Sequence, residues 1–244
     1  MRLSGVAQTQ ESPLDLGLRQ YMLRVYNYMA SGLVLTGIFA YGGVKVPALL
    51  NMMYAAGPTG QLQPTMFAYI IMFSPLAFIL VMNFGIQKLQ ASTVQALFWG
   101  FAVLMGLSMT HIFLVYTGTS ITRVFFIAAG TFASMSLYGY TTKRDLSKIG
   151  SFLFMGLIGV VIASLVNIFI GSTMMQFIIS LVGVVVFVGL TAYDTQSIKE
   201  EYIGGLEHQN GDVVTKGAIM GALRLYLDFI NLFLMLMQLL GNRE

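Results

Sequence analysis

The sequence predicts an all-α membrane protein with seven transmembrane helices in one domain. Hydrophobic residues make up 57% of its 244 residues, and charged residues make up only 9%. An ordinary soluble domain contains about 25% charged residues, so this chain has too little charge to cover a water-exposed surface. A helix needs about 20 apolar residues to cross the hydrocarbon layer. The roughly 139 hydrophobic positions therefore allow about seven crossings.

The composition also excludes several classes of function. Lys and Arg number 13 against 10 Asp and Glu, a net charge of +3 without a dense basic run, so nucleic-acid binding is not expected as a main activity. The chain contains no cysteine. That composition excludes disulfide scaffolds, thiol catalysis and thiolate metal sites.

The elements follow in a simple order. Residues 1–24 are polar and lack an apolar stretch with a cleavage site, so we expect a retained N-terminal tail rather than a signal peptide. One transmembrane domain at 25–240 and a short tail at 241–244 follow. The expected spans are 25–46, 66–86, 94–116, 121–140, 150–170, 174–194 and 217–240. The two longer connections, 47–65 with three prolines and the charged stretch 195–216, are predicted to be solvent-exposed loops.

Basic residues are distributed unevenly over the tails and connections. If the N-terminus is cytoplasmic, nine of them fall inside and three outside, with Arg224 left out because it lies within the seventh span. The inner ones are Arg2, Arg19, Arg24, Lys88, Lys143, Arg144, Lys148, Lys199 and Lys216, and the outer ones are Lys45, Arg123 and Arg243. Because basic residues concentrate on the cytoplasmic side, we expect the N-terminus inside and the C-terminus outside.

Ionisable residues at membrane depth are the strongest functional signal in such a chain. Asp228 lies about eleven residues into the seventh span, roughly 16 Å deep at 1.5 Å per residue. It belongs to a stripe at helical spacing on an otherwise apolar helix. The stripe consists of Gly217, Gly221, Arg224, Asp228, Asn231, Met235 and Gln238. We therefore expect this helix to be central, with its stripe facing a cavity or a partner helix; a purely structural polar seam is the alternative.

Asp194 closes the sixth predicted span, near the cytoplasmic boundary. Alone it is a solvated carboxylate at a helix end. Beside Asp228 in a low dielectric, the two groups could not both ionise cheaply and would titrate as a coupled pair. Such a pair can sense pH, and when ionised it offers oxygen ligands to a hard cation such as Ca²⁺. The sequence by itself does not place the two side chains in contact.

Two further ionisable residues lie within predicted spans. Arg224 is one turn before Asp228, so it either pairs with that carboxylate or extends to the cytoplasmic interface. His111 lies about five residues from the outer end of the third span and is expected to be a satisfied polar or interfacial group rather than a ligand.

Three stretches resemble the Bax inhibitor-1 family, in its bacterial YccA-like branch. They are Gly139-Tyr140-Thr141-Thr142-Lys143-Arg144-Asp145-Leu146, Leu190-Thr191-Ala192-Tyr193-Asp194-Thr195-Gln196, and Leu225-Tyr226-Leu227-Asp228-Phe229-Ile230-Asn231-Leu232-Phe233-Leu234. The likeness runs from about residue 21 to residue 240.

The resemblance implies a seven-helix fold with the last helix wrapped by the other six. It also implies a pH-sensitive calcium leak with a di-aspartyl sensor, matched here by Asp194 and Asp228, and no tightly bound cofactor. Some members have a second-helix arginine that latches onto this pair. The stretch 66–86 carries no charged residue, so Asn83 is only a weak substitute for that latch.

Two other functions are weighed against the leak. Bacterial relatives are linked to control of a membrane-anchored AAA protease, which implies a binding protein without ion flux. Intramembrane aspartyl proteases also use two helical aspartates, and Tyr193-Asp194 fits their first motif. Their Gly-x-Gly-Asp and Pro-Ala-Leu motifs are absent, because Leu225-Tyr226-Leu227 precedes Asp228 and no proline follows Pro75. We therefore expect no enzymatic activity.

Overall fold

The computed structural model describes residues 13–57 and 61–243. Its described part is almost entirely helical. The long helices are α1 (Pro13–Lys45), α3 (Met66–Gly85), α4 (Ala91–Ser108), α6 (Gly118–Thr141), α7 (Ser147–Ile170), α8 (Thr173–Ile203) and α9 (Gly211–Leu240). The short elements are α2 (Pro47–Met53), β1 (Tyr54–Ala56), β2 (Leu62–Pro64), the 3-10 helices η1 (Met109–His111) and η2 (Leu206–His208), and α5 (Ile112–Val115).

Six helical stretches of the described chain are long and apolar enough to cross a membrane, with α4, η1 and α5 counted together as one. The pair α1 and α2, bent by 88°, passes the same test as a unit, which gives up to seven spans. The predicted all-α membrane class is therefore confirmed. Polar N-caps begin several of these helices, as expected from the capping preference of Ser, Thr and Asn. They are Thr65, Thr117, Ser172 and Asn210.

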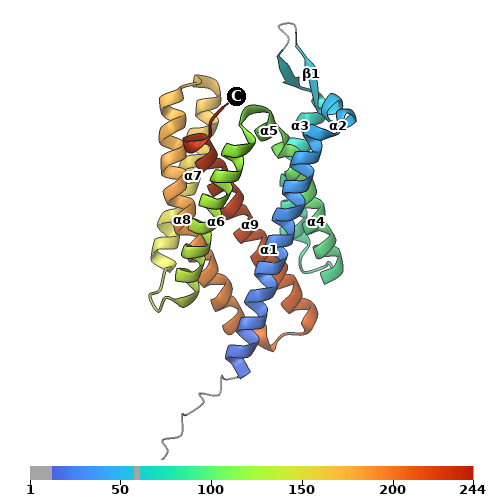
Figure 1. The fold of residues 1–244 in the computed structure, drawn as a ribbon. Helices are drawn as coiled ribbons and strands as arrows, with labels where there is room; N and C mark the ends of the chain where they lie inside the picture. Colours follow the sequence, from blue (N-terminus) through green and yellow to red (C-terminus); the bar gives the residue numbers. More distant parts are fainter. Residues whose placement is uncertain (1–12, 58–60, 244) are drawn as a thin grey trace, which may run out of the picture.

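Helix α9 is central in the bundle (Figure 1). About two thirds of the residues in its most apolar stretch are buried, a larger share than in any other span of the described chain. It packs directly against α1, α4, α6 and α8, whereas α3 packs on α4 and α7 packs on α8. The predicted enclosure by six helices is thus built in two layers, four helices in contact with α9 and two outside them.

Helix α1 begins twelve residues before the predicted first span. Residues 1–12 of the expected tail lie outside the described residues, but 13–24 are helical and continuous with the span. Leu18, Tyr21 and Met22 are buried at helical spacing. Tyr21 stacks on Tyr202 of α8, with ring centroids 4.6 Å apart. This amphipathic start was missed because the surrounding residues are polar.

The predicted loop at 195–216 is wrong, because most of it is helical. Helix α8 continues to Ile203 and α9 already begins at Gly211. The extension of α8 is packed, since the Gln196 side chain donates to the Arg144 carbonyl at 2.8 Å and accepts from the Leu146 amide at 2.8 Å. The actual connection includes Gly205, whose φ of 139° favours glycine.

The predicted loop at 47–65 is partly ordered. Helix α2 and a two-stranded antiparallel hairpin, with Ala55 opposite Gln63, replace most of it. Figure 1 shows this hairpin projecting from the end of the bundle that also carries the C-terminus, opposite the start of α1. It is therefore remote from the α8–α9 connection.

Candidate functional site

The polar stripe of α9 faces α8. Gly221 lies against Ile198, Met235 lies against Gly183, and Gln238 accepts a hydrogen bond of 2.6 Å from the Ser180 hydroxyl. The expectation that the stripe faces a partner helix is confirmed. Because α8 and α9 are neighbours in sequence and antiparallel, successive turns of one helix meet successive turns of the other along the whole seam.

The structure brings Asp194 and Asp228 together in the middle of this seam. Their carboxyl groups lie within hydrogen-bonding reach of each other. Asp228 is only 5% exposed, and Asp194 is half-buried. Asp194 does not end its helix as the sequence suggested, because α8 runs nine residues further. The pair is therefore held by two continuous helices rather than by a loop.

One oxygen of this pair lacks a donor. Asp228 Oδ2 is buried and makes no hydrogen bond to any described residue. Buried polar atoms are nearly always partnered, and an unpartnered carboxylate oxygen in a low dielectric is costly. A proton shared with Asp194 or a bound cation satisfies this atom. The geometry thus suits a site that exchanges a proton for a cation.

A cavity of about 600 Å³ opens beside the pair, between α7, α8 and α9. It is lined by Gly150, Ser151, Phe154, Leu157, Phe187, Leu190, Tyr193, Asp194, Arg224, Leu227, Asp228 and Asn231. Asn231 donates its amide N–H to the Leu227 carbonyl at 2.8 Å, so its amide oxygen is the ligand atom it can offer. Most of the wall is apolar, which concentrates the polar groups at the two aspartates.

Arg224 extends toward the end of the bundle that carries the α8–α9 connection instead of pairing with Asp228. Its Nη2 lies 2.7 and 2.8 Å from the two carboxylate oxygens of Glu201, and Nη1 donates weakly to Ser197 Oγ at 3.5 Å. Glu201 was missed in the sequence. A signal existed, because Ser197 and Glu201 are three and seven residues after Asp194 and therefore share its helix face.

The described residues offer few ligands for a metal ion. They contain no group of three or more His, Asp or Glu side chains that could hold one. Two carboxylates and one amide oxygen are fewer than the six to eight oxygens that Ca²⁺ takes in a tight site. These described residues alone would therefore hold a cation weakly.

The remaining candidates lie away from the pair. His111 is exposed in η1, with Nδ1 3.0 Å from the Ser108 carbonyl oxygen, as expected for an interfacial group. Helix α3, which lacks basic residues, packs on α4 rather than on the α8–α9 seam. Helix α3 therefore has no basic residue that could form a latch, and it does not lie next to the aspartate pair.

Comparison with known proteins decides the family. Residues 18–244 match the family described as inhibitor of apoptosis-promoting Bax1. The chain belongs to the Bax inhibitor-1 family. The resemblance drawn from the three motifs is thereby confirmed over nearly the whole chain.

Members of this family from distant bacteria align along almost their full length. An uncharacterised protein of Rickettsia prowazekii, RP147, is 50% identical over 97% of this chain and 95% of its own length. The inner membrane protein YbhL of Escherichia coli is 44% identical over 93% and 94%. An uncharacterised membrane protein of Streptococcus pyogenes is 34% identical over 94% and 96%.

Proposed function

We propose that this Bax inhibitor-1 protein is a pH-sensitive calcium leak of the bacterial inner membrane, with Asp194 and Asp228 as its di-aspartyl sensor, and that it has no enzymatic activity. The observation that carries the proposal is the contact between two carboxyl groups on neighbouring transmembrane helices, beside a cavity of about 600 Å³. The inner-membrane location follows the name of the Escherichia coli relative.

Proton and calcium compete at this pair. Two bare carboxylates repel strongly in a low dielectric, so the pair holds one shared proton near neutral pH. When that proton leaves, the site gains a negative charge and free oxygen ligands for Ca²⁺. When it is present, the hydrogen bond draws α8 and α9 together. Calcium entry into the cavity is therefore linked to proton release.

The ion pair of Arg224 and Glu201 forms the cytoplasmic lip of the cavity. Arg224 lines the cavity, while Glu201 holds its guanidinium from the next turns of α8. The Arg224 and Glu201 side chains are 37% and 46% exposed, so the lip is in contact with water. In this position Arg224 adds a positive charge near the aspartates without neutralising either of them by direct contact.

The outer side of the cavity is closed by packing. The cavity ends near Phe187 and Asn231, and one turn further Met235 lies on the backbone of Gly183, with its sulfur 2.9 Å from where a Cβ would stand. An apolar constriction of this kind blocks ions by excluding water. We infer that opening requires α8 and α9 to separate at this contact.

The test is calcium flux into liposomes that contain the purified protein, over a series of pH values. We expect wild-type flux to depend on pH and Asp228→Asn to give a flat profile, because the amide can neither lose nor share a proton. Asp212→Asn is the matched control on the same helix, since Asp212 pairs with Lys216 outside the cavity. It should keep the wild-type profile.

A wild-type profile in Asp228→Asn would contradict the proposal. The pair would then be a packing seam, and regulation of a membrane-anchored AAA protease without ion flux would be the better function. No contact among the described residues favours that alternative at present.

We further propose that the N-terminus is cytoplasmic and the C-terminus lies outside, on the basis of the nine-to-three distribution of basic residues. A reporter enzyme that is active only outside the cytoplasm should be active when it is fused to the C-terminus. Activity of a cytoplasm-specific reporter at that position would overturn this topology and reverse the two ends of the cavity.

A further inference from the structure

A second hollow region lies on the opposite flank of α9. Helices α1 and α6 both pack against α9 but hardly against each other, so α9 is visible between them in Figure 1. Two cavities fill this space, an inner one of about 370 Å³ and an outer one of about 490 Å³. We call the two together the α1–α6 crevice.

The crevice is apolar along its walls. Phe125, Phe229 and Phe233 line the outer cavity, and Met22 and Phe132 line the inner one. In the wall of the inner cavity, the Tyr26 hydroxyl is 2.7 Å from Ser136 Oγ, which in turn is 2.9 Å from Thr195 Oγ1. These hydroxyls satisfy one another. The walls therefore suit hydrocarbon rather than water.

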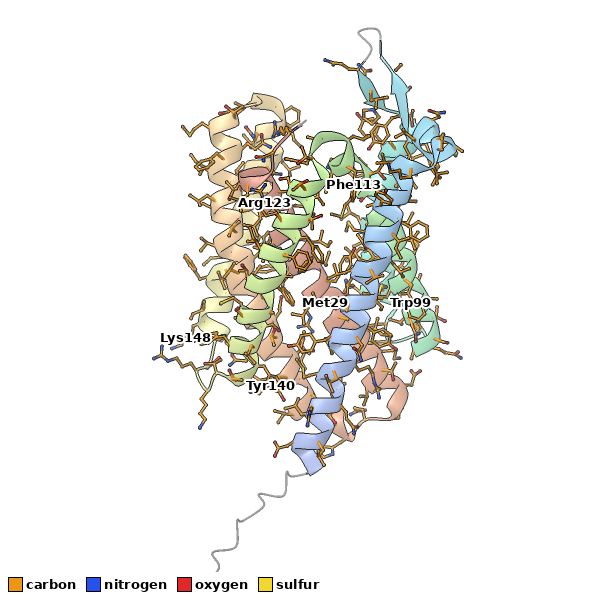
Figure 2. All side chains as sticks on the ribbon, viewed as in Figure 1. Met29, Trp99, Phe113, Arg123, Tyr140 and Lys148 are labelled. Carbon is orange, nitrogen blue, oxygen red and sulfur yellow. The ribbon has the colours of Figure 1, made fainter. Side chains whose placement is uncertain are left out.

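The inner cavity opens sideways toward the bilayer. Leu23 on α1 and Leu137 on α6 form its two lips, with exposed fractions of 52% and 63%. A side opening at this depth faces acyl chains and not water. Figure 2 places Phe113, Met29 and Tyr140 in order from the outer end of the crevice to its cytoplasmic end.

Among the described residues, Arg19 is the only charged one that lines either cavity. It lies at the level of the lipid headgroups, because Arg19 and Lys45 are 26 residues apart on one helix, about 39 Å at 1.5 Å per residue. That length matches a bilayer of roughly 40–45 Å including its headgroup layers. An apolar crevice with a cation at headgroup level matches the chemistry of a phospholipid.

A second positive charge lies beside the same mouth. Lys199 donates to the Tyr140 carbonyl at 2.8 Å, and its ammonium is 5.6 Å from the centre of the Tyr140 ring. Tyr140 itself lines the inner cavity, and none of the described residues that line it is acidic. Basic pockets between transmembrane helices on the cytoplasmic side attract anionic headgroups.

We propose that the inner cavity of the α1–α6 crevice binds an anionic phospholipid of the cytoplasmic leaflet. Its phosphate lies at Arg19, and one acyl chain lies between α1 and α6 against Phe132. This site is independent of the aspartate pair and of calcium flux. A lipid here also determines how far α1 and α6 can approach each other over α9.

The test uses tryptophan fluorescence quenched by brominated lipids. Trp99 on α4 is the only tryptophan of the chain, so Trp99→Phe gives a silent background. Leu137→Trp then reports from the crevice. Leu80→Trp is the matched control, because it lies at a similar distance from the cytoplasmic end of α3 and is 55% exposed on the lipid-facing surface.

Brominated phosphatidylglycerol is compared with brominated phosphatidylcholine. We expect the preference for quenching by brominated phosphatidylglycerol over brominated phosphatidylcholine to be about five times larger at position 137 than at position 80. This is the factor that one basic residue near an anionic headgroup supplies. Arg19→Gln should clearly lower that preference, with Lys199 left as the remaining positive charge at the mouth. Arg144→Gln, which changes an exposed basic residue outside the cavity lining, should leave it intact.

Three results would overturn the proposal. Equal headgroup preference at positions 137 and 80 would show that position 137 contacts only the lipid that surrounds the whole protein. An unchanged preference in Arg19→Gln would show that the lipid phosphate does not bind at Arg19. Absence of quenching at position 137 by either brominated lipid would mean that protein, such as a second copy of the chain, covers the crevice.

Discussion

The two flanks of α9 differ in polarity and in packing. Toward α8, α9 presents Gly221, Arg224, Asp228 and Gln238, and nearly every turn meets a matching residue of its neighbour. Toward α1 and α6, it presents large apolar side chains beside the α1–α6 crevice. One flank thus holds its neighbour by specific polar contacts, and the other borders an apolar crevice.

This difference shows where a membrane helix can place charge. Charged groups in hydrocarbon require a protein partner, and the closely packed α8–α9 seam supplies one for Arg224 and for each aspartate. A loosely packed flank cannot do so, and the one cation among the described residues that line it, Arg19, lies near the start of α1. Charged side chains in this bundle are therefore found where a neighbouring helix supplies a partner.

The largest expected effect comes from two glycines of α6. A Cβ at Gly139 would collide with the backbone of Ala192, two residues before Asp194, whereas a Cβ at Gly130 meets nothing within 4 Å. Gly139→Ala should lower stability by about 1–3 kcal/mol, as overpacking does. Gly130→Ala should not lower it. Thermal unfolding followed by Trp99 fluorescence measures both, and equal losses would show that the contact of α6 with α8 beside the aspartate pair is not closely packed.

An intermediate effect is expected at the ion pair of Arg224 and Glu201. Arg224→Gln removes a positive charge near the aspartates and favours the proton-bound pair, so the pH midpoint of calcium flux should rise. Glu201→Gln releases Arg224 to turn toward the aspartates, so the midpoint should fall. Shifts in the same direction would contradict the geometry. Stability should change little, because partly exposed ion pairs contribute about 0–1 kcal/mol.

The smallest effect is expected from the tyrosines at the crevice. Tyr226 Oη is 2.6 Å from Thr36 Oγ1 in the buried core, and Tyr26 bonds Ser136 across the crevice. Each Tyr→Phe change removes one hydrogen bond, which contributes about 0.5–1.5 kcal/mol. Tyr26→Phe should lie at the lower end, because Tyr26 is half-buried whereas Tyr226 is fully buried. A larger loss for Tyr26→Phe than for Tyr226→Phe would contradict this comparison.

The centre of the fold and the aspartate pair could be predicted from the sequence. Asp228 lies in a stripe at helical spacing, and such a stripe on an apolar helix has to face protein. Asp194 was found through its motif, since a lone carboxylate beside a polar stretch carries no spatial information. The contact between them depends on the register of α8 against α9, which no local pattern encodes.

The ends of the helices and the crevice could not be predicted. Hydropathy finds residues surrounded by lipid, and it therefore missed residues 13–24 and 195–203, which are amphipathic and packed against protein. Glu201 was hidden in that second stretch. The crevice depends on the distance between α1 and α6, which is set by their separate contacts with α9. Of the features of the crevice, the sequence showed only the positive charge of Arg19.

The length of α8 has a mechanical consequence. Its 31 residues span about 46 Å, so the helix exceeds the hydrocarbon thickness of about 30 Å. From Asp194 to its last residue, Ile203, is about 14 Å of unbroken helix. A helix this short behaves as a stiff rod. A force applied at the projecting end therefore reaches the carboxyl pair directly, and a protein bound at Ile203 and its neighbours could change the distance between the two aspartates.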